Sequence, residues 1–77
     1  MSNENFYFEN TSGNHSKFWA VFIVKSDNSH WFLIRRWGKI SENGRVMQER
    51  FYNHYDAENK RDKLIEEKRA KGYQAVL

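Results

Sequence analysis

Short segments rich in aromatic and β-branched residues, separated by clusters of Asn, Ser and Gly, fill the first two thirds of the sequence. Such clusters interrupt regular structure, so each segment between them is expected to be a β-strand. The expected strands are ENFYFE at Glu4–Glu9, KFWAVFIVK at Lys17–Lys25, HWFLIRRW at His30–Trp37, and a fourth from Arg45 to about Phe51. The short spacing between them predicts antiparallel pairing.

Two of these segments and the turn that follows them carry more specific patterns. Lys17–Lys25 is apolar at both odd and even positions, which is typical of a central strand covered on both faces. His30–Trp37 begins apolar and ends charged, so its second half is expected to leave the core. Asn43-Gly44 predicts a tight hairpin turn with positive φ at both residues.

A helical period replaces the alternating pattern from His54 to Lys71. Asn53 is expected to cap the start of this helix with the help of Asp56, and Gly72 is expected to end it. Tyr73–Val76 can return as a short strand or pack as a tail. The face expected to pack on the sheet is a small apolar patch flanked by basic stems: Ala57, Arg61, Leu64, Ile65 and Lys68.

Together these elements predict an α+β fold, a twisted antiparallel β-sheet of four to five strands packed with one C-terminal α-helix. The 77 residues allow a single domain over residues 1–77, with an ordered core at about 5–76. A domain this small has a thin core, which most of the thirteen Phe, Trp and Tyr residues are expected to fill.

The absence of cysteine excludes a disulfide framework and a Cys-based zinc site, and it favours a cytoplasmic location. The longest apolar run, Phe18–Val24, is far shorter than the roughly 20 residues that span a bilayer, so no membrane partner is expected.

No residue pattern in the sequence is typical of catalysis or of cofactor binding. His15, His30 and His54 fall in different expected elements, and no two of them have the spacing of metal ligands. The four glycines are isolated, so no phosphate-binding glycine loop is present. We therefore expect a non-enzymatic domain without a metal or a cofactor.

Positive charge is concentrated around one tryptophan. Residues 35–50 carry five basic and two acidic side chains, in a chain whose total net charge is +3. Cations pair with phosphate and an indole stacks on a base or sugar, so this segment predicts nucleic-acid binding. The alternative is that the indole is ordinary core filler with a solvated rim of arginines. The predicted nucleic-acid-binding residues are Trp37, Gly38, Lys39, Arg36, Arg35 and Arg45.

At these residues the sequence resembles the WGR domain family, named for a Trp-Gly-Arg motif that is Trp37-Gly38-Lys39 here, within RRWGKI. KFWAV at 17–21 is similar to the opening strand of the family, and ENFYFENTSGNHS is similar to the lead-in of bacterial stand-alone members. Other residues with similar spacing in the family are Asn43-Gly44, Phe51, Ala57, Leu64-Ile65, Lys68 and Lys71-Gly72-Tyr73. The resemblance covers roughly residues 5–76.

The resemblance implies a twisted antiparallel sheet with one helix. The family is known as a module of DNA-dependent poly(ADP-ribose) polymerases and also occurs in bacterial regulator-like proteins. In the polymerases the motif tryptophan stacks on a sugar near a DNA strand break. By resemblance Trp37 stacks on a sugar, Gly38 forms a tight turn and Lys39 contacts phosphate. Arg36 or Arg45 would make further backbone contacts.

One departure from the motif has a chemical consequence. Lys39 stands where the family has arginine, which keeps the charge but loses the planar fork of the guanidinium. Phosphate attraction is therefore expected to remain, while any bidentate or interdomain contact becomes weaker.

Two functions remain open on the sequence. The first is a non-enzymatic nucleic-acid-binding module that grips the DNA backbone or a strand end, with DNA favoured over RNA. The second is a protein–protein interaction module that uses the sheet edge or the basic helix face at Lys60, Lys63 and Lys71. A monomer is expected.

Overall fold

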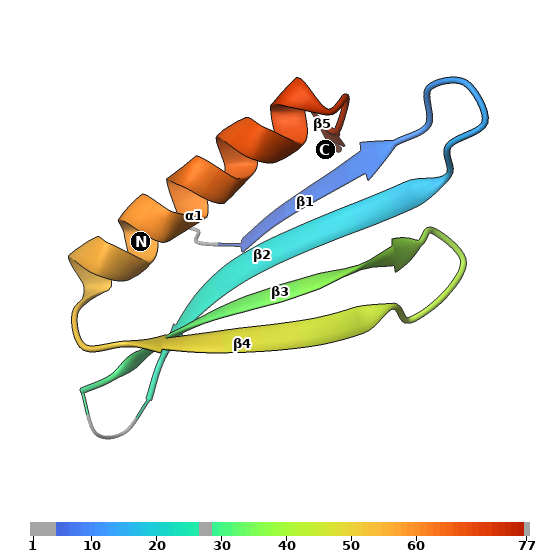
Figure 1. The fold of residues 1–77 in the computed structure, drawn as a ribbon. Coiled ribbons are helices and arrows are strands. Elements are labelled where there is room, and N and C mark those ends of the chain that lie inside the picture. Colours follow the sequence, from blue (N-terminus) through green and yellow to red (C-terminus); the bar gives the residue numbers. More distant parts are fainter. Residues whose placement is uncertain (1–4, 27–28, 77) are drawn as a thin grey trace.

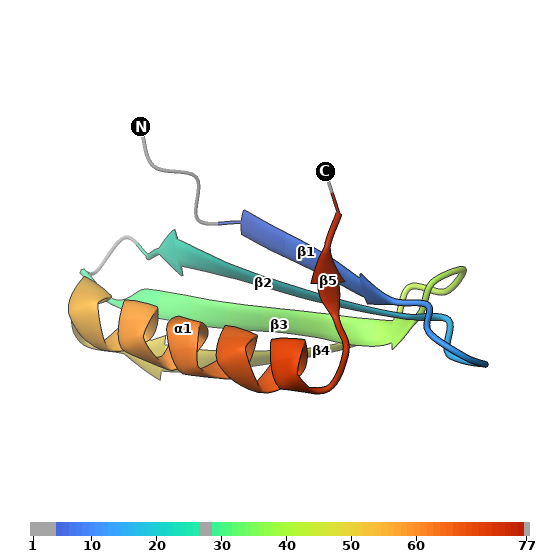
Figure 2. The ribbon, with the colours of Figure 1, turned by 90° about the horizontal axis from the view of Figure 1, so that it is seen from above.

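An antiparallel sheet lies against one helix in the computed structural model, which describes residues 5–26 and 29–76 (Figures 1 and 2). The elements are β1 (Asn5–Asn10), β2 (Lys17–Lys25), β3 (Trp31–Lys39), β4 (Arg45–Phe51), α1 (His54–Ala70) and β5 (Gln74–Ala75). The strand order across the sheet is β4-β3-β2-β1-β5. This arrangement confirms the predicted α+β fold class.

The observed strands lie close to the predicted ones. β2 has the predicted ends, and Glu4, the predicted start of the first strand, lies outside the described residues. β3 continues two residues past Trp37 because it still pairs with β2 there, with Gly38 opposite Phe18 and Lys39 opposite Lys17. Gly38 therefore lies within a strand, and the tight turn implied for it by resemblance is wrong.

The predicted two-residue hairpin at Asn43-Gly44 is also wrong. Residues 40–44 join β3 to β4, with a turn in which the Glu42 N–H donates to the Lys39 carbonyl at 3.0 Å. Gly44 has a φ of +80°, whereas the φ of Asn43 is not positive. A Cβ on Gly38 would lie 2.8 Å from the Gly44 Cα, so the two backbones approach where neither residue has a side chain. Gly38 therefore accommodates a close backbone approach.

The core lies between the sheet and the helix. Its buried residues are Phe8, Trp19, Val21, Ile23, Leu33 and Ala57. Leu64 and Ile65 of α1 pack against this cluster, and the ammonium of Lys68 lies 5.7 Å from the centre of the Trp19 ring. The predicted packing face of the helix is therefore confirmed.

The central position predicted for β2 is confirmed, and the predicted cover on both of its faces holds for its first half only. In the described ranges α1 covers one face only, as Figure 2 shows. On the other face neighbouring side chains bury Phe18: the Tyr7 ring stacks on it at 5.9 Å, and the Arg36 guanidinium lies 5.1 Å from its ring centre. Beyond this shielded part Val24 is exposed.

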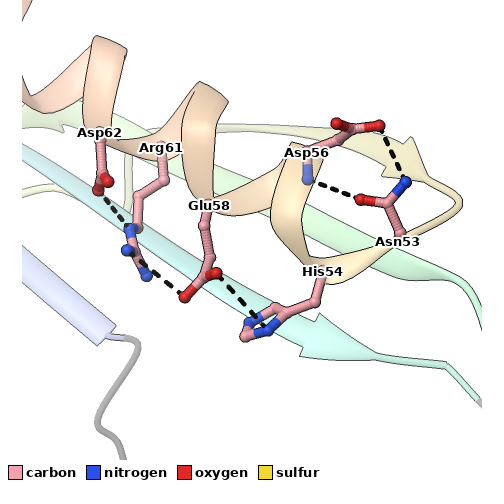
Figure 3. Close-up of polar contacts among 6 residues, drawn as sticks. All are labelled: Asn53, His54, Asp56, Glu58, Arg61 and Asp62. Atoms are coloured by element: carbon pink, nitrogen blue, oxygen red, sulfur yellow. Dashed lines mark hydrogen bonds and ion pairs between the residues drawn. The ribbon is translucent and has the colours of Figure 1, made fainter.

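The N-terminal end of α1 is capped as predicted (Figure 3). The Asn53 Oδ1 accepts from the Asp56 N–H at 2.8 Å, and the Asn53 Nδ2 donates to the Asp56 carboxylate at 3.0 Å. One turn further on, the Glu58 carboxylate lies between His54, at 3.8 Å, and Arg61, at 4.0 Å. The first two turns are thus held by local polar contacts.

The C-terminal end of α1 has the capping motif that Gly72 predicts. Gly72 has a φ of +102° and its N–H donates to the Arg69 carbonyl, while the Tyr73 N–H donates to the Lys68 carbonyl. This pair of bonds is the Schellman arrangement, in which a left-handed glycine lets the chain leave the helix. The chain then pairs with β1 as the short strand β5.

Candidate nucleic-acid interface

One end of the sheet brings together three segments that are distant in the sequence. Residues 11–16, residues 40–44 and the C-terminal end of α1 all lie at this end (Figure 1). A pocket of about 470 Å³ opens there, and we call it the basic pocket. It is lined by Asn10, His15, Lys17, Trp37, Gly38, Lys39, Lys68, Lys71 and Tyr73.

Among the described residues, four lysines and no acidic side chain line the basic pocket. Lys17 and Lys39 face each other directly across β2 and β3, a like-charge pair that disfavours the strand pairing. Lys68 and Lys71 come from the end of α1, where the helix dipole favours positive charge. Such a cluster is electrostatically costly without a counter-charge, so the pocket is suited to an anion.

The pKa of Lys68 is lowered both by burial and by this concentration of positive charge. Burial lowers the pKa of its ammonium below the ordinary lysine value, and the nearby charge of Lys71 lowers it further. More distant contributions from Arg35 and Lys17 act in the same direction, while Glu67 opposes them. A bound anion would stabilise the charged form and shift this pKa back upward.

Asn10 fixes the shape of the pocket from β1. Its side chain is 5% exposed, and its Oδ1 accepts from both the backbone N–H and the hydroxyl of Ser12. Its Nδ2 donates to the Lys71 carbonyl at 3.2 Å. Asn10 thus ties the β1–β2 connection to the end of α1 and positions the Lys71 backbone.

Trp37 lies between the core and the surface. It is half-buried and packs against the core, opposite Trp19 in the strand register. It also borders both the basic pocket and a second pocket of about 300 Å³. The second pocket is lined by Trp19, Arg35, Trp37, Met47, Leu64, Glu67, Lys68 and Lys71. Trp37 therefore packs against the core and also lines both pockets.

The six predicted site residues do not form one surface. Trp37, Gly38 and Lys39 line the basic pocket. Arg35 lies between sheet and helix, where its guanidinium is 3.4 Å from the Glu49 carboxylate and its side chain is 17% exposed.

Arg36 and Arg45 are not among the residues that line the basic pocket. Arg36 points to the opposite face of the sheet and donates to the Asn43 carbonyl at 3.1 Å. Arg45 is exposed on β4, opposite Trp37 in the register.

Sequence reasoning missed Lys17, Lys68 and Lys71 as members of the site. Lys17 could have been found by pairing the strands, since the antiparallel register places it beside Lys39. On the sequence, Lys68 belongs to the face of the helix that packs on the sheet, and Lys71 belongs to the basic helix face, apart from the Trp37 motif. The Lys68 ammonium in fact lies 5.2 Å from the centre of the Tyr73 ring.

The three histidines make different contacts. His15 lines the basic pocket, His30 contacts Tyr52 edge-on, and His54 stacks on Trp31. Within residues 5–26 and 29–76, no three His, Cys, Asp or Glu side chains are grouped so as to hold a metal ion. None of the helical structure in these ranges has the length and apolar character needed to cross a bilayer.

Comparison with known proteins supports the geometry. The family model of the WGR domain matches residues 4–77. No curated protein shows significant sequence similarity to the chain. The crystal structure of a protein from Bacteroides fragilis superposes with a TM-score of 0.82 and 27% identity over 95% of this chain. The matched part is 19% of that protein, so this chain spans about a fifth of its length.

Proposed function

The chain belongs to the WGR domain family, and on that premise we propose that it is a non-enzymatic module that binds the backbone of DNA, or a DNA strand end, in the basic pocket. The family is generally nucleic-acid-binding. The observation that carries the proposal is the convergence of four lysines in a pocket that Trp37 also lines, with no acidic side chain among the described lining residues.

Each residue type in the pocket has a distinct part in this proposal. The lysine ammonium groups pair with phosphates as point charges, without the bidentate geometry of arginine. The indole of Trp37 stacks on a sugar or base. Asn10 already uses its amide within the protein, so it is not available to read a base edge. Contacts of this kind position the backbone without reading sequence.

Trp37→Ala is the direct test of the pocket. Removing one stacking contact is expected to lower the affinity for DNA about 5- to 150-fold, since stacking contributes about 1–3 kcal/mol per base. Tyr52→Ala is the matched control because Tyr52 is an exposed aromatic residue on the turn that follows β4, outside the residues that line the pocket. The measurement is fluorescence anisotropy with labelled duplex, nicked and single-stranded DNA, and with RNA of the same sequence.

The salt dependence adds a second criterion to the same titration. Four phosphate contacts predict a log–log slope of about −3.6 on duplex DNA and about −2.8 on single strands. Equal affinities of the wild type and Trp37→Ala would remove the pocket from the proposal. Tighter binding to RNA than to DNA would replace DNA as the ligand.

The affinity is also expected to depend on pH through Lys68. Its pKa is lowered in the free protein, so it loses its proton at a lower pH than an ordinary lysine, and phosphate binding selects the protonated form. The affinity should therefore fall as the pH rises through the lowered pKa, with proton uptake on binding near that pH. Titrations at a series of pH values, for the wild type and Lys68→Arg, measure this. A curve of the same shape in both proteins would exclude Lys68 as the titrating group.

A further inference from the structure

β4 forms one edge of the sheet, and exposed apolar side chains gather on it and just after it. Of seven large hydrophobic residues that are exposed in the described ranges, four lie here: Val46 at 63%, Met47 at 50%, Tyr52 at 72% and Tyr55 at 70%. The outer side of β4 has no strand beside it within those ranges (Figure 1). An edge strand of this length with apolar side chains is a template for pairing with another strand.

The charges on β4 are complementary to those of a second β4 in one antiparallel register. Arg45, Met47 and Glu49 alternate along the strand and share the face that carries the helix. With Met47 on a two-fold axis, each Arg45 stands opposite a Glu49 of the other copy. An axis at Gln48 would place Met47 opposite Glu49, and an axis at Glu49 would oppose two carboxylates. Among these three central registers, only the one at Met47 pairs opposite charges.

The contacts that Glu49 makes within its own chain leave room for this pair. The Arg35 guanidinium is 3.4 Å from the Glu49 carboxylate, and the Lys60 ammonium is 4.0 Å away. Both distances are long for a charged hydrogen bond, and a carboxylate accepts about four such bonds. A further arginine can therefore bind Glu49 without displacing Arg35.

We propose that β4 is a homodimerisation edge, to which a second copy of this chain adds its own β4 antiparallel, with Met47 at the two-fold axis. The product is a continuous sheet with both helices, and both basic pockets, on the same face. Strand spacings of about 4.8 Å and a rise of about 3.4 Å per residue place the two Trp37 Cα atoms about 20 Å apart. Two pockets on one face can hold one nucleic acid, which makes the second contact intramolecular.

This dimer differs from the monomer expected from the sequence, and it is tested without nucleic acid, so its failure would leave the proposed function untouched. The first measurement is sedimentation equilibrium of the full chain over about 5–500 µM, the range expected for a short edge contact. The weight-average mass should rise to twice the monomer mass at the upper end. A monomer throughout would overturn the proposal.

Met47 allows a test with two opposite charges. Met47→Lys and Met47→Glu each place like charges on the axis, so each variant alone should be monomeric at concentrations where the wild type is dimeric. An equimolar mixture should recover the dimer, because the axis then joins a lysine to a glutamate. The half-exposed position of Met47 lets both variants fold, which far-UV circular dichroism checks.

Val24→Lys is the matched control, since Val24 is exposed on the helix-free face of β2 and away from β4. It should dimerise like the wild type. If Val24→Lys separates the copies while the two Met47 variants remain dimeric, the copies meet through the sheet face and the edge proposal is wrong. Failure of the Met47 mixture to associate would also contradict it.

Discussion

Lys39→Glu combined with Lys71→Glu is expected to lower the affinity for duplex DNA about 100-fold. Each reversal replaces an attractive phosphate contact by a repulsive one, and about 1.4 kcal/mol for each corresponds to a factor of ten. Both side chains are exposed, so the fold should survive. The slope of log affinity against log salt should become shallower by about two. Fluorescence anisotropy on one duplex at several salt concentrations measures both quantities.

Lys25→Glu combined with Lys63→Glu is the matched control, because it changes the net charge by the same amount at two exposed residues outside the basic pocket. Its affinity loss should stay within about threefold, as expected for solvent-screened charges that make no direct phosphate contact. Equal losses in the two double variants would mean that binding follows the overall charge and not the pocket. A larger loss in the control would move the interface to the exposed lysines outside the pocket.

Most of the fold follows from local pattern. The charged ends and apolar interior of Lys17–Lys25 set the limits of β2, and Asn53 and Gly72 set the limits of α1, because strand ends and helix caps depend on neighbouring residues. The 40–44 connection was not predictable in this way. Its form depends on Gly38 and Gly44 approaching each other, which requires β3 to be seated already against β2.

The candidate site likewise has a part that follows from neighbouring residues and a part that depends on tertiary contacts. The Trp37-Gly38-Lys39 motif is contiguous and was recognised in the sequence, whereas Lys17 and Lys68 reach it only through strand register and helix packing. Counting charge along the chain was misleading at Arg35 and Arg36. Neighbouring residues on a strand point to opposite faces, so a basic run in the sequence is not a basic patch in space.

Trp19→Ala is expected to lower the free energy of unfolding by about 3–5 kcal/mol. Trp19 is 2% exposed and packs against Phe8, with ring centroids 5.7 Å apart, so truncation leaves a large cavity in a thin core. A core of this size rarely supplies more than about 3–5 kcal/mol in total, so the variant should be largely unfolded at 25 °C. Urea unfolding followed by circular dichroism measures the free energy of unfolding of the wild type and of the variant. A folded variant of nearly wild-type stability would contradict the assigned core.

Trp37→Ala is the control within the same strand pair, because Trp37 stands opposite Trp19 in the register but is only half-buried. Its truncation removes less buried surface and should leave a folded domain, with DNA affinity as the property that changes. The two variants then distinguish a loss of stability, in Trp19→Ala, from a loss of DNA affinity, in Trp37→Ala. If Trp37→Ala unfolds as completely as Trp19→Ala, the ring of Trp37 belongs to the core, and the basic pocket would have to bind phosphate by its lysines alone.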